Sequence, residues 1–246
     1  MYRVGVDVGS TYTKYCILED MTGKLTLCCE PTPIRQREYF EGKLARLWTE
    51  YQGCSIVTCG YGRKNISYDR TVSELTALAA GAARQCPEIP VILDIGGQDT
   101  KVIRQEGGRL KAFFTNERCA AGCGLFLGNV LRLLQMGFEE VDLTGAGSPE
   151  LRLSSVCAVF AQSEIVELLA AGVSSTAIIQ AVLAQILVQA RTLLGKVECS
   201  AVALSGGLTK IAGIGPFAEQ ILEQRIVLPE HGAYLSAIGC AMTELK

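Results

Sequence analysis

Two periodicities alternate along the chain and divide it into expected strands and helices. Short apolar runs that alternate with polar residues and are bounded by Gly, Asp or Pro predict strands. Longer stretches with an apolar residue at roughly every third or fourth position predict helices. In the first part the pattern predicts three strands, a helix, a strand and a helix, at residues 4–9, 13–20, 24–30, 37–51, 55–60 and 71–85.

The second part repeats this opening and adds a helical insert. Strands are predicted at residues 90–96, 100–106 and 109–116, and helices of the insert around 125–135, 158–172 and 176–195. The chain closes with strands at 200–206 and 225–229, a helix between them and a last helix from about residue 233. Mixed sheets flanked by helices, in an α/β fold of two lobes, are therefore expected. The lobes would span residues 1–86, with the last helix (about 233–246) packing back on them, and 87–232 with the helical insert.

An internal repeat is the clearest sign of this organisation. Residues 4–14 read VGVDVGSTYTK and residues 91–101 read VILDIGGQDTK, and both consist of an apolar strand followed by D-x-G-x-x-x-T-K. Two copies of one supersecondary unit indicate two similar lobes. The recurring positions are Asp7 and Asp94, Gly9 and Gly96, Thr13 and Thr100, and Lys14 and Lys101.

The repeated unit has the chemistry of a phosphate clamp. A strand that ends in Asp can hold Mg²⁺ directly or through water, because this cation prefers few carboxylates together with water and phosphate oxygens. A glycine turn lets backbone N–H groups approach an anion closely. A lone copy would be weak, but two copies predict a nucleotide cleft between the lobes. Ser205, Gly206 and Gly207, after an apolar strand, read either as a third contact to the nucleotide or as a helix-entry turn.

Composition excludes some classes of partner. The net charge is −2 and the charged residues are interspersed, so no basic patch suited to nucleic acid is present. The N-terminal segment enters a strand at once and shows no secretory signal, which predicts a cytoplasmic protein. The long apolar stretch at residues 176–195 carries Gln180, Gln185, Gln189 and Arg191, so we expect a buried core helix rather than a membrane span.

The cysteines pose the central question. Eleven cysteines in a reducing compartment argue against a disulfide framework, and most of them should be ordinary buried side chains. The segment RCAAGCG, from Arg118 to Gly124, lies between an expected strand and an expected helix. Its residues alone leave open a metal site, a redox pair, a nucleophile or a plain turn.

The motifs together resemble a known family. VDVGSTYTK, LDIGGQDTK and SGG, in this order, are similar to the two phosphate motifs and the adenosine motif of the actin, hexokinase and chaperone ATPase superfamily. Within it, NERCAAGCG followed by SSVCAVFAQSEIV resembles the ATP-dependent activators of 2-hydroxyacyl-CoA dehydratases, which are related to the ATPase subunits of benzoyl-CoA reductase. The likeness runs through nearly the whole chain.

The resemblance implies an ATPase that transfers electrons. It implies ATP/ADP, Mg²⁺ and one 4Fe-4S cluster at the interface of a homodimer, with Cys119 and Cys157 of each subunit as ligands. Reduced ferredoxin or flavodoxin would supply a low-potential electron, and an iron–sulfur dehydratase or reductase component would receive it. Both cysteines precede expected helices, whose N-termini favour an anionic cluster. We expect ATP-driven motion of the lobes to rotate these helices.

The candidates for ATP chemistry follow by position. Asp7 and Asp94 would organise Mg²⁺, and either Gln98 or Asp99 would orient the attacking water. Glu74 lies on a helix that often supplies a water-positioning side chain in this superfamily, although it can equally be a solvated helix charge. The remaining contacts to the nucleotide are expected from Gly9, Ser10, Thr11, Thr13, Lys14, Gly96, Gly97, Ser205, Gly206 and Gly207.

Cys123 departs from the family pattern, which carries Thr at this position. If residues 119–123 were helical, Cys119 and Cys123 would stand at i and i+4 and face the same way. Cys123 would then be a spare thiol, an alternative ligand or an inert buried residue, and we favour the last. A zinc site of Cys119, Cys123 and Cys157 is a weaker alternative, because structural zinc sites usually use four local ligands.

Other functions fit the same fold. A small-molecule kinase of the sugar-kinase type would need a catalytic Asp and a substrate pocket in the first lobe, for which the compact N-terminal part leaves little room. A nucleotide-dependent assembly or reactivation ATPase without a redox role would be colourless.

Overall fold

The fold is given by a computed structural model, which describes residues 1–116, 120–155 and 157–245. Cys119 lies outside these residues. The chain forms two compact units: unit 1 comprises residues 1–89, 104–112 and 234–246, and unit 2 comprises residues 90–103 and 113–233. The domain boundaries expected from the sequence stay a prediction.

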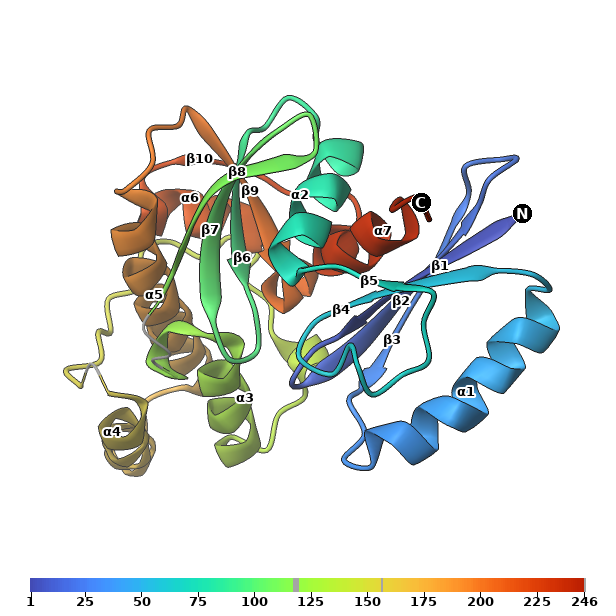
Figure 1. Ribbon diagram of the computed structural model, residues 1–246. Coiled ribbons are helices and arrows are strands. Elements are labelled where there is room, and N and C mark those ends of the chain that lie inside the picture. Colours follow the sequence, from blue (N-terminus) through green and yellow to red (C-terminus); the bar gives the residue numbers. More distant parts are fainter. Residues whose placement is uncertain (117–119, 156, 246) are drawn as a thin grey trace. The chain divides into compact units, whose positions relative to one another are not determined.

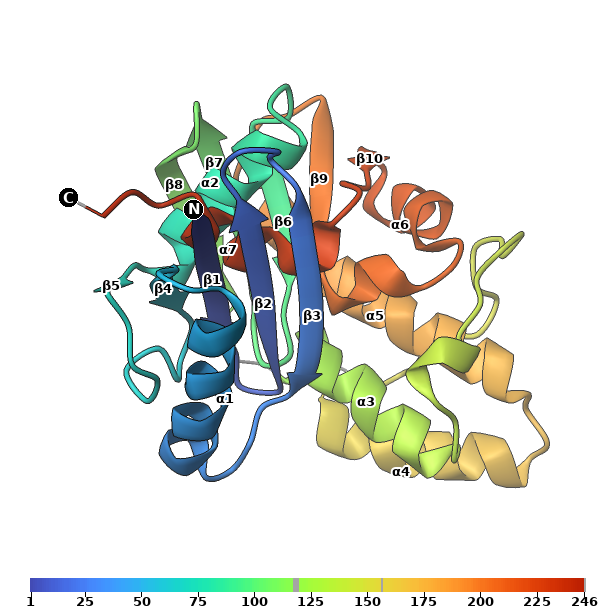
Figure 2. The same cartoon turned by 90° about the vertical axis from the view of Figure 1, so that its right-hand side faces the viewer.

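Unit 1 contains the first sheet, whose strand order is β3-β2-β1-β4-β5. The β1–β2 and β2–β3 pairs are antiparallel, whereas β1–β4 and β4–β5 are parallel. Figure 2 shows β2 between β1 and β3. The elements are β1 (Tyr2–Val8), β2 (Tyr12–Glu19), β3 (Leu25–Pro31), α1 (Gln36–Glu50), β4 (Ser55–Cys59), β5 (Arg70–Thr71), α2 (Glu74–Gln85) and α7 (Leu235–Ala241).

Both faces of the first sheet are covered by helices. Successive residues of a strand point to opposite faces, and on β2 the side chain of Tyr15 packs with Phe40 of α1, whereas Cys16 packs with Ala237 of α7. The end of the chain therefore completes the core of its beginning. Figure 1 shows α7 and α1 with the sheet between them.

The second sheet repeats the topology of the first, with strand order β8-β7-β6-β9-β10. The duplication predicted from the sequence is confirmed, and so is the α/β class with two mixed sheets. The repeat also explains β5, which the sequence did not predict: it is the two-residue counterpart of β10 at the sheet edge. The strands are β6 (Val91–Ile95), β7 (Thr100–Glu106), β8 (Arg109–Thr115), β9 (Ala201–Gly206) and β10 (Arg225–Val227).

Helices of unit 2 cover one face of this sheet. Side chains of α3, α5 and α6 pack with Val91, Leu93 and Val202 in a single apolar cluster. The helices are α3 (Gly124–Leu133), α4 (Ala158–Ala170), α5 (Ser175–Leu194) and α6 (Ile214–Leu222), and short 3₁₀ turns lie at Ala120–Gly122, Phe138–Glu140, Gly207–Lys210 and Gly232–Tyr234.

The helix α5 is the core helix that the sequence predicts. Among the described residues it alone is long and apolar enough to cross a membrane, but 56% of its most apolar 18-residue stretch is buried inside the protein. Ile178, Val182 and Ile186 along this helix are fully buried. Its composition therefore reflects burial against the second sheet.

Three glycines allow α7 to pack very closely within unit 1. A Cβ added at Gly81 of α2 would lie 1.9 Å from the Leu235 carbonyl oxygen. A Cβ at Gly239 would lie 1.8 Å from the Ala77 carbonyl oxygen, and one at Gly5 of β1 would lie 2.0 Å from that of Ala237. Each contact is with backbone, so the neighbours cannot move aside cheaply.

Gly81→Ala should therefore destabilise the protein by at least about 1–3 kcal/mol, because the extra methyl group forces α2 and α7 apart. The matched control is Gly42→Ala in α1, where nothing lies within 4 Å of the added Cβ. That change should stabilise by ~0.5–1 kcal/mol through helix propensity. Urea unfolding midpoints measure both, and equal midpoints for the two variants would contradict the close packing.

Candidate functional site

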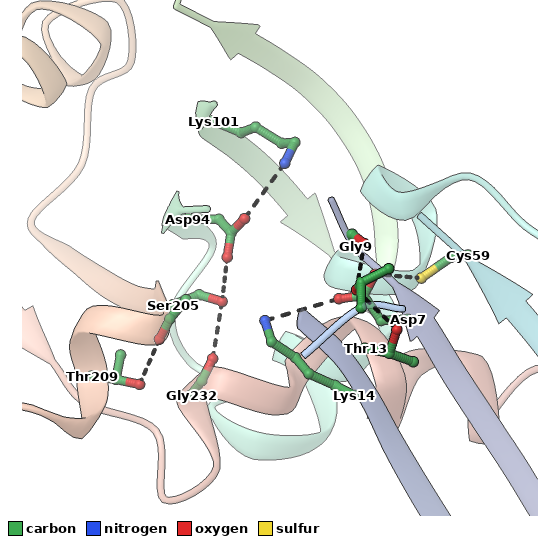
Figure 3. Close-up of polar contacts among 12 residues, drawn as sticks. Asp7, Gly9, Thr13, Lys14, Cys59, Asp94, Lys101, Ser205, Thr209 and Gly232 are labelled. Carbon is green, nitrogen blue, oxygen red and sulfur yellow. Dashed lines mark hydrogen bonds and ion pairs between the residues drawn. The ribbon is translucent and has the colours of Figure 1, made fainter. Parts of the chain in front are cut away.

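The first expected phosphate turn begins at a buried carboxylate. Asp7 lies near the end of β1 and is 5% exposed, and Lys14 stands opposite it in the antiparallel register with β2. Lys14 Nζ lies 3.9 Å from Asp7 Oδ2, and the thiol of Cys59 donates to Asp7 Oδ1 across 3.6 Å (Figure 3). The Asp7 carboxylate is thus held by neighbours on β2 and β4, near the C-terminal end of the central strand β1.

Thr32, just after β3, braces this turn. Its hydroxyl donates to the Gly9 carbonyl across 2.8 Å and lies 3.0 Å from the hydroxyl of Thr13. Its backbone N–H donates to the Thr11 carbonyl. Residues 10–12 remain exposed, so their N–H groups and hydroxyls are accessible to an anion. Thr32 could not be recognised from the sequence, because it lies about 20 residues after the turn that it contacts.

The second expected phosphate turn has the same Asp–Lys pair. Asp94 is 7% exposed, and Lys101 Nζ lies 3.6 Å from Asp94 Oδ2 and 2.9 Å from Asp99 Oδ1. Ser205 donates its hydroxyl hydrogen to Asp94 Oδ1 across 2.7 Å and also lies 3.0 Å from the Gly232 carbonyl (Figure 3). Lys101, which the repeat marks as the counterpart of Lys14, thus pairs with two carboxylates of this turn.

The Ser-Gly-Gly motif lies beside this turn. The parallel register between β6 and β9 places Asp94 opposite Ser205 and Ile95 opposite Gly206. Gly206 has φ +99°, and a Cβ there would lie 2.1 Å from the Ile95 carbonyl oxygen, so only glycine fits. A 3₁₀ turn follows from Gly207, and the helix expected between the last two strands begins later, at Ile214. Unit 2 therefore brings the second turn and the third glycine element together on neighbouring strands.

The candidates for positioning water differ in their surroundings. Asp99 is engaged with Lys101, whereas Gln98 is exposed in the turn. Glu74 is the first residue of α2 in unit 1. The hydrogen bond with Cys240, burial, and the nearby carboxylates of Asp7 and Glu74 raise the pKa of the Cys59 thiol well above its usual range. Asp7 and Glu74 are therefore both close enough to Cys59 to act on its thiol.

The position of Cys123 corrects one expectation. The α-helix begins at Gly124, after a 3₁₀ turn at Ala120–Gly122, and Cys123 is the N-cap residue with extended backbone angles (φ −144°, ψ 169°). It is therefore not one helical turn beyond residue 119. Its side chain is fully buried, as expected for an inert thiol. The alternative zinc set includes Cys119 and so lies partly outside the described residues, within which no group of three or more His, Cys, Asp or Glu able to hold a metal occurs.

Cys157 lies where the sequence predicts, directly before a helix. It is exposed and is the N-cap residue of α4, whose first turn also exposes Val159 (72%) and Phe160 (70%). Cys119, the other expected ligand, lies outside the described residues. The Cys157 thiol is thus accessible to solvent, on a surface that also exposes apolar side chains.

The segment before Cys157 is fixed from α4 and α5. Glu164 accepts the N–H groups of Ser154 and Ser155 across 2.7 and 3.0 Å. Gln185 Nε2 donates to the Ser155 carbonyl across 3.1 Å. Burial opposes ionisation of Glu164, but the two amide hydrogen bonds outweigh it and lower its pKa. The sequence did not single out this clamp, because it depends on the path of the chain between the helices.

Comparisons with known proteins agree with this geometry. Residues 4–243 match the BadF/BadG/BcrA/BcrD ATPase family. The activator of lactoyl-CoA dehydratase from Anaerotignum propionicum is 33% identical over 98% of this chain and 96% of its own. The (R)-2-hydroxyglutaryl-CoA dehydratase activating ATPase of Acidaminococcus fermentans is 31% identical over 100% of this chain and 98% of its own.

A solved structure gives the same result. The activator of 2-hydroxyisocaproyl-CoA dehydratase from Clostridium difficile with bound ADPNP aligns with a TM-score of 0.86 and 28% identity, over 98% of this chain and 93% of that one. The resemblance drawn from the sequence motifs and the predicted fold class are therefore both confirmed.

Thr32→Val should weaken ATP binding by about fivefold, the effect of one lost hydrogen bond, because the first turn loses its brace. Thr32→Ser keeps the hydroxyl and should bind ATP like the wild type. Titration with a fluorescent ATP analogue measures both affinities. Wild-type affinity in Thr32→Val would show that the turn is rigid without Thr32.

Proposed function

Because the chain belongs to the BadF/BadG/BcrA/BcrD ATPase family, we propose that it hydrolyses ATP to deliver a low-potential electron to an iron–sulfur dehydratase or a related reductase component. The observation that carries the redox part is the exposed thiol of Cys157 at the start of α4, beside exposed apolar side chains. A thiol kept only for packing would be buried.

The two turns are the proposed nucleotide site. Asp7 and Asp94 would hold Mg²⁺, directly or through water, since each carboxylate stands at a strand end with a lysine beside it. Backbone and hydroxyl groups would bind the phosphates and the adenosine; these residues are Gly9, Ser10, Thr11, Thr13, Lys14, Gly96, Gly97, Ser205, Gly206 and Gly207. The exposure of Ser10, Thr11 and Gly207 supports this role, and so does the close packing at Gly206; Thr13 and Ser205 are buried.

Gln98 is the favoured residue for orienting the attacking water. Its amide is exposed in the second turn, whereas the Asp99 carboxylate is already held by Lys101. Glu74 remains a second candidate because it and Asp7 both act on the Cys59 thiol within unit 1. Replacing either side chain by an apolar one would lower the rate of hydrolysis more than the affinity for ATP.

A 4Fe-4S cluster shared by a homodimer would be held by Cys119 and Cys157 of each chain. Two thiolates per chain cannot complete a four-thiolate shell, so a twofold axis would supply the others. The donor chemistry at Cys157 fits iron, and the N–H groups at the start of α4 favour an anionic group. Val159 and Phe160 would be covered by the second copy.

The side chain of Gln189 has a buried donor without a hydrogen-bond acceptor in the part of the chain that the structure describes. Its side-chain nitrogen is buried and has no hydrogen-bond partner among the described residues, and its oxygen lies 2.5 Å from where a Cβ on Gly122 would be. A buried donor usually finds an acceptor. A thiolate or sulfide near the segment after residue 116 would be such an acceptor. When bound, the cluster would supply the one-electron redox chemistry.

The partners follow from this role. Reduced ferredoxin or flavodoxin would donate the electron, and the names of the two relatives above support a 2-hydroxyacyl-CoA dehydratase as the acceptor. A cytoplasmic location, and the absence of nucleic-acid and membrane partners, stay predictions.

Anaerobically purified protein should be brown and contain about four irons per dimer, which is about two per chain. The variants Cys119→Ser and Cys157→Ser should each lose most of the iron and the visible absorption of the cluster. Cys28→Ser is the matched control, because Cys28 is also exposed but lies on β3 of unit 1.

Two outcomes would contradict the proposal. Colourless protein that still hydrolyses ATP would favour an assembly or reactivation ATPase. Equal iron loss in Cys28→Ser would show that exposed thiols bind iron without specificity.

A further inference from the structure

The helix α3 begins on the second phosphate turn. Gly124 and Leu125, its first residues, donate their N–H groups to the carbonyls of Gly96 and Gly97, each across 2.8 Å. The first N–H groups of a helix have no partner within the helix and need an external acceptor. Cys123 supplies no side-chain cap, so the turn carbonyls take that role.

Thr100 and Asn116 make a second connection to the same segment. The Thr100 hydroxyl donates to the Gly122 carbonyl across 2.5 Å, and this side chain is 1% exposed. The Asn116 side-chain oxygen accepts the N–H of Thr100 across 3.1 Å, and the Asn116 N–H donates to the Thr100 carbonyl across 3.1 Å. Residues 116 and 122 thus bracket Cys119 and are both bonded to Thr100.

Residues 122 and 124 are closely packed, one against α5 and the other against the phosphate turn. A Cβ on Gly122 would lie 2.5 Å from Gln189 Oε1 of the buried helix α5, and a Cβ on Gly124 would lie 3.0 Å from the Gly96 carbonyl oxygen. A shift of the turn would therefore have to displace the segment, because there is no space to absorb it.

The geometry of the peptide bond connects the two ends of this arrangement. The carbonyl of one residue and the N–H of the next lie in one rigid plane and point in opposite directions. The Gly96 and Gly97 carbonyls face α3, so the N–H groups of Gly97 and Gln98 face the other way. A phosphate that draws these N–H groups toward itself would rotate the same planes and pull on the start of α3.

We infer that Thr100 and Asn116 are positioning residues that couple the second phosphate turn to residues 116 and 122–125, the described parts on either side of Cys119, within unit 2. The inference deepens the proposed function, on which its redox consequence rests. This route runs through hydrogen bonds inside one unit, and it does not require motion of one lobe against the other.

Hydrogen exchange tests the connection directly. In the full-length protein, exchange of the Gly124 and Leu125 N–H groups is measured by NMR or by fragment-resolved mass spectrometry, without nucleotide, with ADP and with a non-hydrolysable ATP analogue. The wild type should show different exchange rates in these states. Thr100→Val should reduce that difference about fivefold, as expected for one lost hydrogen bond.

Controls separate coupling from simple damage. Thr100→Ser keeps the hydroxyl and should restore the wild-type difference, and Asn116→Ala should lose it in the same way as Thr100→Val. In iron-loaded protein, the nucleotide-dependent shift of the reduction potential should shrink in both variants. ATP affinity should stay close to that of the wild type.

Two results would overturn the inference. One is a wild-type nucleotide response in both Thr100→Val and Asn116→Ala. The other is a wild type in which bound nucleotide leaves exchange at Gly124 and Leu125 unchanged. The exchange measurement needs bound nucleotide but no iron, so a colourless protein would overturn the proposed redox function and leave this test intact.

Discussion

A buried carboxylate at the end of a central strand, paired with the lysine across the following turn, is the interaction on which both halves depend. A buried charge without a partner is costly, so the pair fixes the strand end and the turn together. Cys59 adds a thiol to Asp7, and Ser205 adds a hydroxyl to Asp94. The same backbone unit thus presents an oriented carboxylate in each half, with different neighbours.

Duplication made the fold predictable. Because the repeat D-x-G-x-x-x-T-K fixed two equivalent positions, the strands around them could be aligned, and the strand order of both sheets follows the same pattern. The features that the sequence did not predict are short segments whose structure depends on neighbours distant in the chain. The strand β5 has only two residues, which is too short to show a periodic pattern, and the hydrogen bonds from the start of α3 to the Gly96 and Gly97 carbonyls leave no mark in the sequence.

The candidate site was predictable only where the motifs are contiguous. Asp7 and Asp94 could be found from the repeat, and Cys157 from the resemblance of its motif to the activator family. Thr32 and Glu164 could not be found, because each acts on backbone groups that are close in space but separate in sequence. Side chains that bond to backbone need no particular partner residue, so they leave no pairwise pattern to read.

The close packing of α7 on β1 and α2 has a consequence for synthesis on the ribosome. Most of unit 2 is one continuous stretch and can acquire its core as it emerges. The first sheet is completed later, because α7, which covers one of its faces, follows unit 2 along the chain. Until α7 has been synthesised, Cys16 and Leu18 lack the helix that buries them. The first sheet therefore exposes one apolar face to solvent while unit 2 is being synthesised.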